Sequence, residues 1–337
     1  MMPRHNPNLD VRAQEDKTPS LEYLLNNLDL SFLWSKVRSK YSLHGWVSTF
    51  DCNAMFKTLL LKEIRRLSSK RKLASFLKKD RRWLKICGFD KPPHHDSFSE
   101  FIDRIGVGAF REVFNEMVRQ LNDVENIGRI VAIDSTLFEA YSKDSKSKAN
   151  ADPDARWGYS ATTKTFVFGY KLHVACDAES ELPLAYTLTP ANVYDSVEYL
   201  NLLKDLTARG IKPKVVLADA GYDSVANIRQ TFERYGATPI IAMNKRNSKD
   251  RFRKYEFDLP VDRESDEWKN LYRQRGAVER LFSRLKEEMD FKAVKVRGYE
   301  SVEIHAALSL ITMLSVALVA KKTGNSELST SLNFWRF

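Results

Sequence analysis

The fold is indicated most clearly by RIVAIDSTLFEA (residues 129–140), together with KVVLADAGYDS (214–224). Both contain short runs of Val, Ile and Leu, which are typical of buried strands when turn-forming residues follow. Each run carries one carboxylate, Asp134 within the first and Asp219 at the end of the second. An unpaired buried charge is costly, so both aspartates need a partner. For Asp219 the alternative is a cap on the turn or helix that follows it.

The elements around these two runs alternate in a regular order. An alternating aromatic and valine-rich run predicts a strand at 166–177, and a second apolar run predicts another at 182–190. Asp195, with Glu198 three residues on, predicts a helix N-cap. The remaining expected elements are a helix over 195–208, a helix from about 223 to 235 and a strand at 238–244.

A polar stripe is predicted near the C-terminus, in NLYRQRGAVERLFSRLKEEM (270–289). This stretch has strong helix formers and no proline, so we expect one helix. At about 100° per residue, four polar side chains fall within a sector of roughly 60°, beside an apolar stripe. They are Tyr272, Arg275, Glu279 and Lys286. The simpler alternative is a solvated helix face with an Arg275–Glu279 pair.

The spacing Tyr-x2-Arg-x3-Glu-x6-Lys of these residues resembles the C-terminal signature of DDE transposases of bacterial insertion sequences. The resemblance covers roughly residues 51–320 and predicts two upstream aspartates at strands, which Asp134 and Asp219 match. It implies an α/β fold with a ribonuclease-H-like catalytic core, a mixed five-stranded sheet flanked by helices. The two strand acids would lie on neighbouring strands, with Glu279 alongside.

The resemblance also implies a chemistry. Asp134, Asp219 and Glu279 would bind two Mg²⁺ ions, for which Mn²⁺ can substitute, because carboxylates are hard oxygen ligands. Two such ions can activate an attacking water and stabilise the leaving oxygen. DNA would be cut at the element's end to leave a 3′-OH, which then attacks target DNA. The expected partners are double-stranded DNA, as terminal inverted repeats and target, and a second copy of the chain in a homodimer on paired ends.

Further residues are predicted to lie near DNA. Tyr272, Arg275 and Lys286 would contact phosphates beside the scissile bond. Lys171 and His173 alternate with apolar residues on the strand at 166–177, and could line the same cleft or form an ordinary polar strand face. Trp157 falls in a long loop predicted after the first strand, where it could stack on an end base.

The charge distribution favours a polyanionic partner. The chain has a net charge of +10, and residues 57–85 alone contain 12 Lys/Arg against two acids. A second cluster at 245–254 has six Lys/Arg against one acid. Either cluster could instead be a solubilising face. The candidate DNA contacts are Lys70, Arg71 and Lys72 in the first cluster, and Lys245, Arg246, Arg251, Arg253 and Lys254 in the second.

The domain organisation follows from composition. Residues 1–50 are expected to form a partly disordered segment, and 51–125 a helical, basic, helix-turn-helix-like DNA-binding domain. This domain also resembles the N-terminal domain of many of these transposases. The catalytic domain is expected over 126–322, followed by a tail at 323–337.

Other classes of site have little support in the sequence. Three cysteines at no motif spacing indicate reduced thiols of a cytosolic protein, and no Gly-rich loop supports nucleotide hydrolysis. The apolar run at 304–320 is marginal for a membrane span, so we expect a buried helix and a cytoplasmic, nucleoid-associated protein without a membrane partner. Two alternatives stay open: a metal-dependent nuclease or resolvase of the same fold, and a non-catalytic DNA-binding relic.

Overall fold

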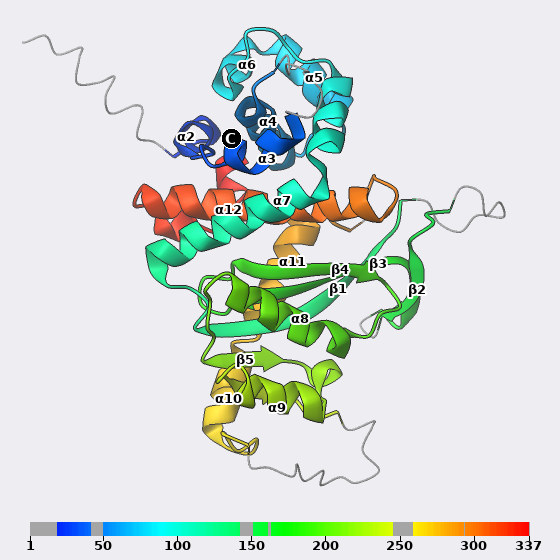
Figure 1. Cartoon of the computed structure of the whole chain (residues 1–337), viewed down its shortest axis with the longest axis vertical. Coiled ribbons are helices and arrows are strands. Elements are labelled where there is room, and N and C mark those ends of the chain that lie inside the picture. The colour runs from blue at the N-terminus through cyan, green and yellow to red at the C-terminus, as the bar shows by residue number, and fades with distance from the viewer. Residues whose placement is uncertain are drawn as a thin grey trace, which may run out of the picture. The chain divides into compact units, whose positions relative to one another are not determined.

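The computed structural model describes residues 19–41, 50–141, 151–160, 163–244, 259–292 and 294–336. The chain divides into two compact units (Figure 1). One unit comprises the chain up to Ala109 together with the part from Ser315 onward, and the other runs from Phe110 to Leu314. The candidate cluster at 245–254 lies outside the described residues.

The second unit is built on a mixed sheet. Its strand order is β2-β3-β1-β5-β6, and β4 also pairs with β3. β1, β5 and β6 run parallel, whereas β3 is antiparallel to β1, β2 and β4. The bounds are β1 Ile130–Glu139, β2 Arg156–Ser160, β3 Thr165–Asp177, β4 Pro183–Pro190, β5 Val215–Ala218 and β6 Thr238–Ile241. The predicted mixed sheet is confirmed, but it has six described strands where five were expected.

The additional strand is β2, which the sequence had placed in a loop. It pairs with the first part of β3, and β4 pairs with the rest. β2 also passes close to Ala191, the residue that follows β4. Gly158 makes this possible, because a methyl group there would lie 2.2 Å from the Ala191 carbonyl oxygen. Its neighbours Trp157 and Tyr159 are exposed. Five residues with one alternating aromatic pair are too short a signal to separate a strand from a loop.

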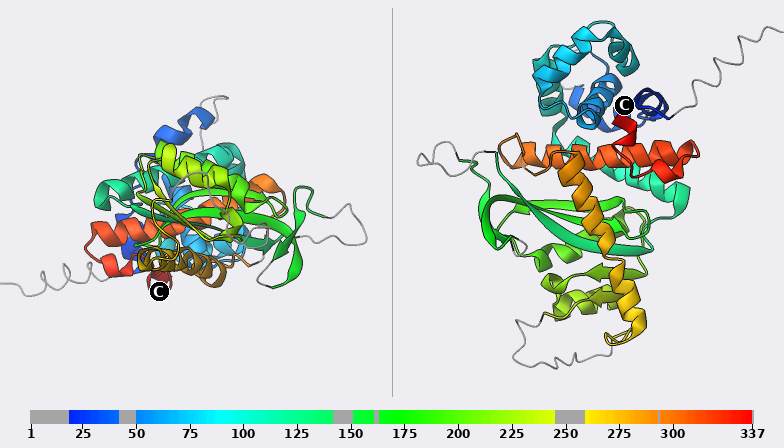
Figure 2. Two further views of the ribbon diagram at one scale, coloured as in Figure 1. Left: turned by 90° about the horizontal axis from the view of Figure 1, so that it is seen from below. Right: turned by 180° about the vertical axis from the view of Figure 1, so that it is seen from behind.

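Helices cover both faces of this sheet. In Figure 1 α8 lies in front of the strands, and it packs against β4, β3 and β1. In the right-hand view of Figure 2, α10 and α11 cross the opposite face, where α11 packs against β1 and β3. The bounds are α8 Asp195–Ala208, η3 Ala220–Tyr222, α9 Val225–Glu233, α10 Asp266–Arg273 and α11 Gly276–Glu288.

The single helix predicted over 270–289 is wrong, because α10 ends at Arg273 and α11 begins at Gly276. Between them the Arg275 amide donates to the Tyr272 carbonyl, three residues back, at 3.0 Å. Such i→i−3 bonds tighten the chain at a helix end. Glycine has low helix propensity, so the helical hydrogen-bond pattern is readily interrupted next to Gly276. The apolar side of α11 is buried as expected, at Val278, Phe282 and Leu285.

Two long helices, α7 (His95–Glu125) and α12 (Tyr299–Lys322), each contribute to both units. Within the second unit, Tyr299 donates to the Leu188 carbonyl of β4 at 2.7 Å, and Arg111 of α7 pairs with Glu303. Among the described residues, α12 is the one helix long and apolar enough to cross a membrane, yet 89% of its most apolar 18-residue window is buried. This burial is typical of a core helix, as the sequence predicted.

The first unit is helical. Side-chain caps begin four of its helices. Ser20 accepts from the Tyr23 amide, Asp51 from the Ala54 amide, Ser69 from the Lys72 amide and Asp80 from the Arg82 amide. The tail returns to this unit, since Arg336 donates to the Ile64 carbonyl at 2.9 Å and Trp335 is buried. The bounds are α2 Leu21–Asn27, α3 Leu33–Tyr41, α4 Cys52–Ile64, α5 Lys70–Lys79, α6 Arg81–Cys87, η4 Ser326–Leu328 and η5 Phe334–Arg336.

Candidate active site

The sheet brings two predicted aspartates together at neighbouring strands. β1 and β5 are parallel, and Ile133 is the partner of Ala218. Asp134 is the next residue of β1, and Asp219 directly follows the end of β5, which confirms that the two acids lie at adjacent strands. Each carboxylate accepts a bond from nearby backbone: Asp134 from the Ser135 amide and Asp219 from the Gly221 amide, both at 2.8 Å.

The electrostatics of this pair favour a bound cation. Burial raises the pKa of Asp134 to about 7, and the neighbouring charge of Asp219 adds to the effect. Burial also raises the pKa of Asp219 above its ordinary value. Both carboxylates are therefore short of compensating positive charge, and a divalent cation between oxygen ligands would supply it.

Glu279 is linked to this pair through a guanidinium. Arg275 donates from Nη1 to Asp134 Oδ2 at 2.8 Å and from Nη2 to Glu279. The Glu279 side chain is 58% exposed in the first turn of α11. The oxygens of Asp134, Asp219 and Glu279 do not all lie within 4.8 Å of one another in this arrangement. The donor set suits Mg²⁺, and Glu279 would have to leave Arg275 to join it.

The other two residues of the polar stripe lie beside the same acids. The Tyr272 ring lies below the Arg275 guanidinium, 5.8 Å from it, and stacks on Trp268 with ring centroids 4.8 Å apart. Burial lowers the pKa of Lys286, and the charge of Asp134 opposes this shift. Trp268 was not predicted from the sequence, because no local pattern identifies a tryptophan as the stacking partner of Tyr272.

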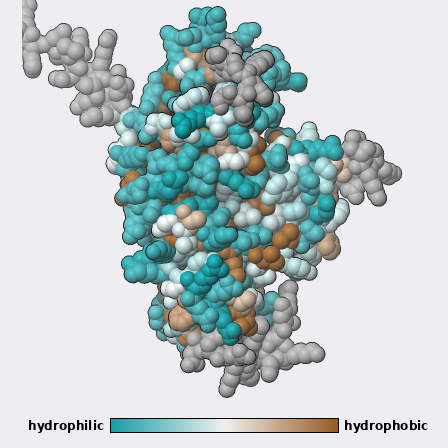
Figure 3. All heavy atoms as spheres, viewed as in Figure 1, coloured by the Kyte–Doolittle hydropathy of each residue, from teal (hydrophilic) through white to brown (hydrophobic). Residues whose placement is uncertain are grey.

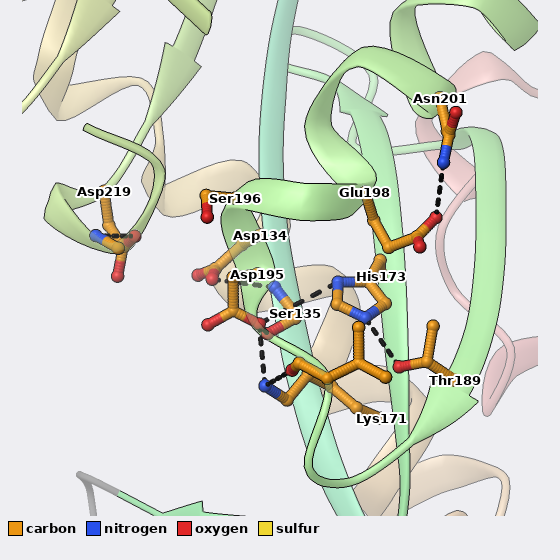
Figure 4. Close-up of polar contacts among 12 residues, drawn as sticks. Asp134, Ser135, Lys171, His173, Thr189, Asp195, Ser196, Glu198, Asn201 and Asp219 are labelled. Carbon is orange, nitrogen blue, oxygen red and sulfur yellow. Dashed lines mark hydrogen bonds and ion pairs between the residues drawn. The ribbon is translucent and has the colours of Figure 1, made fainter. Parts of the chain in front are cut away.

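Lys171 and His173 lie on the opposite face of the sheet, towards α8 (Figure 4). Lys171 Nζ lies 2.9 Å from Asp195 Oδ1 and donates to the Val193 carbonyl at 2.8 Å. His173 Nε2 shares a 2.9 Å hydrogen bond with Thr189 Oγ1, and burial lowers the pKa of this imidazole to about 4. These side chains thus belong to a polar cluster around Asp195.

Asp195 is not the N-cap that its position suggested. The N-cap residue of α8 is Tyr194, whose side chain makes no capping bond, and Glu198 accepts from Asn201 instead. The Asp195 carboxylate accepts a 2.7 Å bond from Ser135 Oγ as well as the Lys171 contact. A lysine within a buried strand needs a carboxylate partner, and that requirement was the signal available in the sequence.

The remaining predicted contacts are scattered. Trp157 lies on β2, 52% exposed, with its ring 5.4 Å from that of Phe168. Lys70 donates to Ser99 Oγ at 3.0 Å, Arg71 contacts His95, and Lys72 is exposed. Hydrophilic side chains cover most of the face shown in Figure 3. Lys245, Arg246, Arg251, Arg253 and Lys254 lie outside the described residues.

A second group of ligand-type side chains lies at the start of α7. His94 Nδ1 and His95 Nε2 lie 3.2 and 3.3 Å from the Asp96 carboxylate oxygens. Among the residues the structure describes, this is the one set of three or more ligand atoms within 4.8 Å. Arg71 contacts the same His95 nitrogen, and His94 and Asp96 are exposed. The group is therefore a surface polar cluster.

Comparison with known proteins agrees with this geometry. The model of the transposase DDE domain family matches residues 125–314, and that of the transposase domain DUF772 matches residues 9–104. A Burkholderia cepacia protein named as the transposase for insertion sequence element IS402 is 31% identical over 163 residues, 45% of this chain. The match spans 66% of that relative's length.

Among solved structures, a piggyBac transposase synaptic complex with hairpin DNA has a similar fold. The TM-score is 0.51 at 13% identity, covering 96% of this chain and 80% of that one. At this identity the likeness concerns the fold alone. The DDE domain model, however, matches more than half of the sequence. The chain therefore belongs to the DDE transposases, a family of DNA-acting enzymes that use divalent metal ions.

Proposed function

We propose that this protein binds the ends of an insertion sequence, cleaves the DNA to free 3′-OH ends and joins those ends to target DNA. One observation carries the proposal: Asp134 lies within β1, Asp219 directly follows the neighbouring parallel strand β5, and Arg275 connects Asp134 to Glu279. Three acids and a guanidinium from three separate parts of the chain thus lie near one another beside β1 and β5.

Asp134, Asp219 and Glu279 are the residues that would hold two Mg²⁺ ions, with Mn²⁺ able to substitute. The raised pKa values of both aspartates support a cation there, and all three ligands are hard oxygens. When bound, such ions activate an attacking oxygen and stabilise a leaving one. Glu279 reaches the aspartates once its exposed side chain turns away from Arg275.

The rest of the polar stripe would hold the DNA backbone. Arg275, released from Glu279, can donate from Nη2 to a phosphate while Nη1 stays on Asp134. Tyr272 keeps the guanidinium in place from below. Lys286 lies about 10 Å further along the helix axis than Glu279, so it would bind a neighbouring phosphate.

The partners follow from this chemistry. The substrates are double-stranded DNA, as terminal inverted repeats and as target. The exposed basic residues of α5 and α6, including Arg71 and Lys72, would contribute to end binding through phosphate charge. Trp157, Lys171 and His173 remain candidates for contacts near the ends. A homodimer would hold two ends together, and the protein would work in the cytoplasm on the nucleoid.

The test is strand transfer by the purified protein. Pre-cut DNA from the termini flanking the coding sequence is incubated with supercoiled target, in Mg²⁺ and in EDTA. Glu279→Gln runs beside the parent protein. Glu287→Gln is the matched control, because Glu287 lies on the same helix, is exposed and pairs with Lys292 at 2.8 Å.

We expect Mg²⁺-dependent joined product from the parent and from Glu287→Gln, and none from Glu279→Gln. Cleavage without joining would favour a nuclease or resolvase of the same fold. DNA binding that persists in EDTA, with no product from any of the three proteins, would favour a non-catalytic relic.

A further inference from the structure

A fourth carboxylate lies beside the proposed metal site. Asp195 begins α8, and its Oδ1 is held by Ser135 Oγ at 2.7 Å and by Lys171 Nζ at 2.9 Å. Ser135 directly follows Asp134 on β1, so their side chains point to opposite faces of the sheet. Asp134 contacts Arg275 on one face, and Ser135 contacts Asp195 on the other. Figure 4 shows Asp195 close to Asp134, with Lys171 on its far side.

The second oxygen of Asp195 is directed towards Asp219. A methyl group built on Gly221 would lie 3.0 Å from Asp219 Oδ1 and 3.7 Å from Asp195 Oδ2. The distance between Asp219 Oδ1 and Asp195 Oδ2 is therefore at most the sum of these two distances. Both bonds from Ser135 and Lys171 use Oδ1, so Oδ2 is the oxygen presented to the acids.

An independent observation points to a ligand at this place. Tyr222 is fully buried, and beyond a contact with Ser135 its hydroxyl has no hydrogen-bond partner among the described residues. Ser135 also donates to Asp195, so the hydroxyl lies beside the group that holds the fourth carboxylate. His173 Nδ1 is likewise buried without a hydrogen-bond partner, and the nearest oxygen of Asp195, Oδ1, lies 3.8 Å away. Buried polar groups are normally satisfied, so a polar ligand is expected between them.

We propose that Asp195 is a fourth carboxylate of the metal site, presenting Oδ2 to the cation that Asp219 holds while Ser135 and Lys171 fix its orientation. The inference rests on the metal site of the proposed function. Lys171 offsets the negative charge that this half-buried fourth acid adds to the site. The competing interpretation is a structural ion pair that fastens α8 to β3 and has no role in cation binding.

The experiment measures Mn²⁺ binding to the full-length protein without DNA, by electron paramagnetic resonance of the free ion and by water-proton relaxation. Asp195→Asn keeps an oxygen for Ser135 and Lys171 but removes the charge. Asp195→Glu keeps the charge and displaces it by one methylene. Asp219→Asn reports on the proposed site itself. Glu198→Gln is the matched control, since it removes one charge from the same first turn of α8.

We expect Asp195→Asn to weaken Mn²⁺ binding about 10-fold or more, as changes around metal ligands commonly do. Asp195→Glu should weaken it less, and Glu198→Gln should stay within about twofold of the parent. Thermal unfolding followed by circular dichroism checks that each variant is folded, and Asp195→Glu serves as the test if Asp195→Asn is not.

The outcomes separate the two proposals. If Asp219→Asn loses Mn²⁺ binding while both Asp195 variants match Glu198→Gln, the fourth carboxylate is refuted and Asp195 only fastens α8. If the parent binds no Mn²⁺, or Asp219→Asn binds it normally, the proposed metal site fails and this inference fails with it.

Discussion

Replacing Asp134 by asparagine should stabilise the metal-free protein at neutral and alkaline pH, although it changes the ion pair with Arg275. Burial, followed by the charge of Asp219, raises the pKa of Asp134 from 3.8 to about 7. Between these values the folded protein keeps a proton that the unfolded chain has released. The free energy of unfolding therefore falls as the pH rises from about 4 to 7, and it stays low above that range.

The magnitude follows from the shift. A rise of about three units, at about 1.4 kcal/mol per unit, corresponds to about 4 kcal/mol at pH 8 and to less than about 1 kcal/mol at pH 4. Rearrangement around the charge lowers the cost, so we expect a gain of about 2–4 kcal/mol for Asp134→Asn at pH 8. The asparagine oxygen can still accept the bond that Arg275 Nη1 donates to Asp134 Oδ2 at 2.8 Å.

The assay is urea unfolding in EDTA at pH 5 and pH 8. The gain of Asp134→Asn should be about 2 kcal/mol larger at pH 8 than at pH 5. Glu233→Gln is the control, because Glu233 is 64% exposed in the same unit and should change stability by less than about 0.5 kcal/mol. A variant less stable than the parent by the same amount at both pH values would refute the reasoning. The Arg275 pair would then outweigh burial, and the acids would have no charge deficit.

Three further changes test neighbouring parts of the structure. Arg275→Gln removes a cation from beside the acids, so Mn²⁺ should bind at least about threefold more tightly while strand transfer falls. Weaker Mn²⁺ binding would contradict this expectation. Gly221→Ala places a methyl group 3.0 Å from Asp219 Oδ1 and should weaken Mn²⁺ binding several-fold. The free energy of unfolding in urea should fall by less than about 1 kcal/mol, and an unchanged Mn²⁺ affinity would count against the proposed site. Asp152→Asn disturbs a buried carboxylate that accepts from Tyr170 Oη at 2.7 Å, so unfolding should lose about 1–3 kcal/mol while Mn²⁺ affinity stays the same, and a loss of affinity would be unexpected.

The parts of the structure around the acids that the sequence predicted correctly rest on local patterns. Asp134 and Asp219 each interrupt or end a run of β-branched residues, and parallel strands bring such ends together. The contact of Arg275 with Glu279 follows from their i, i+4 spacing, which survives the change from α10 to α11. These features depend on a few neighbouring residues, so they can be recognised without knowledge of the tertiary fold.

The parts that escaped prediction depend on distant contacts. Asp195 has the residue type and position of an N-cap, but Lys171 and Ser135, brought in by two strands, bind its carboxylate instead. β2 pairs with the start of β3, and Gly158 lets it pass close to Ala191, a residue that lies 33 positions later in the chain. Neither the partners of Asp195 nor the contact with Ala191 is indicated by nearby sequence.

The arrangement of Asp134 and Ser135 on β1 makes the whole site sensitive to strand register. A slip of one residue would turn the carboxylate towards α8 and the hydroxyl towards α11, so both halves of the site would be lost together. β3 on one side and β5 on the other hold β1 against such a slip. Single-residue insertions or deletions between 130 and 134 should therefore abolish function even in chains that still fold, whereas changes of length in surface loops need not.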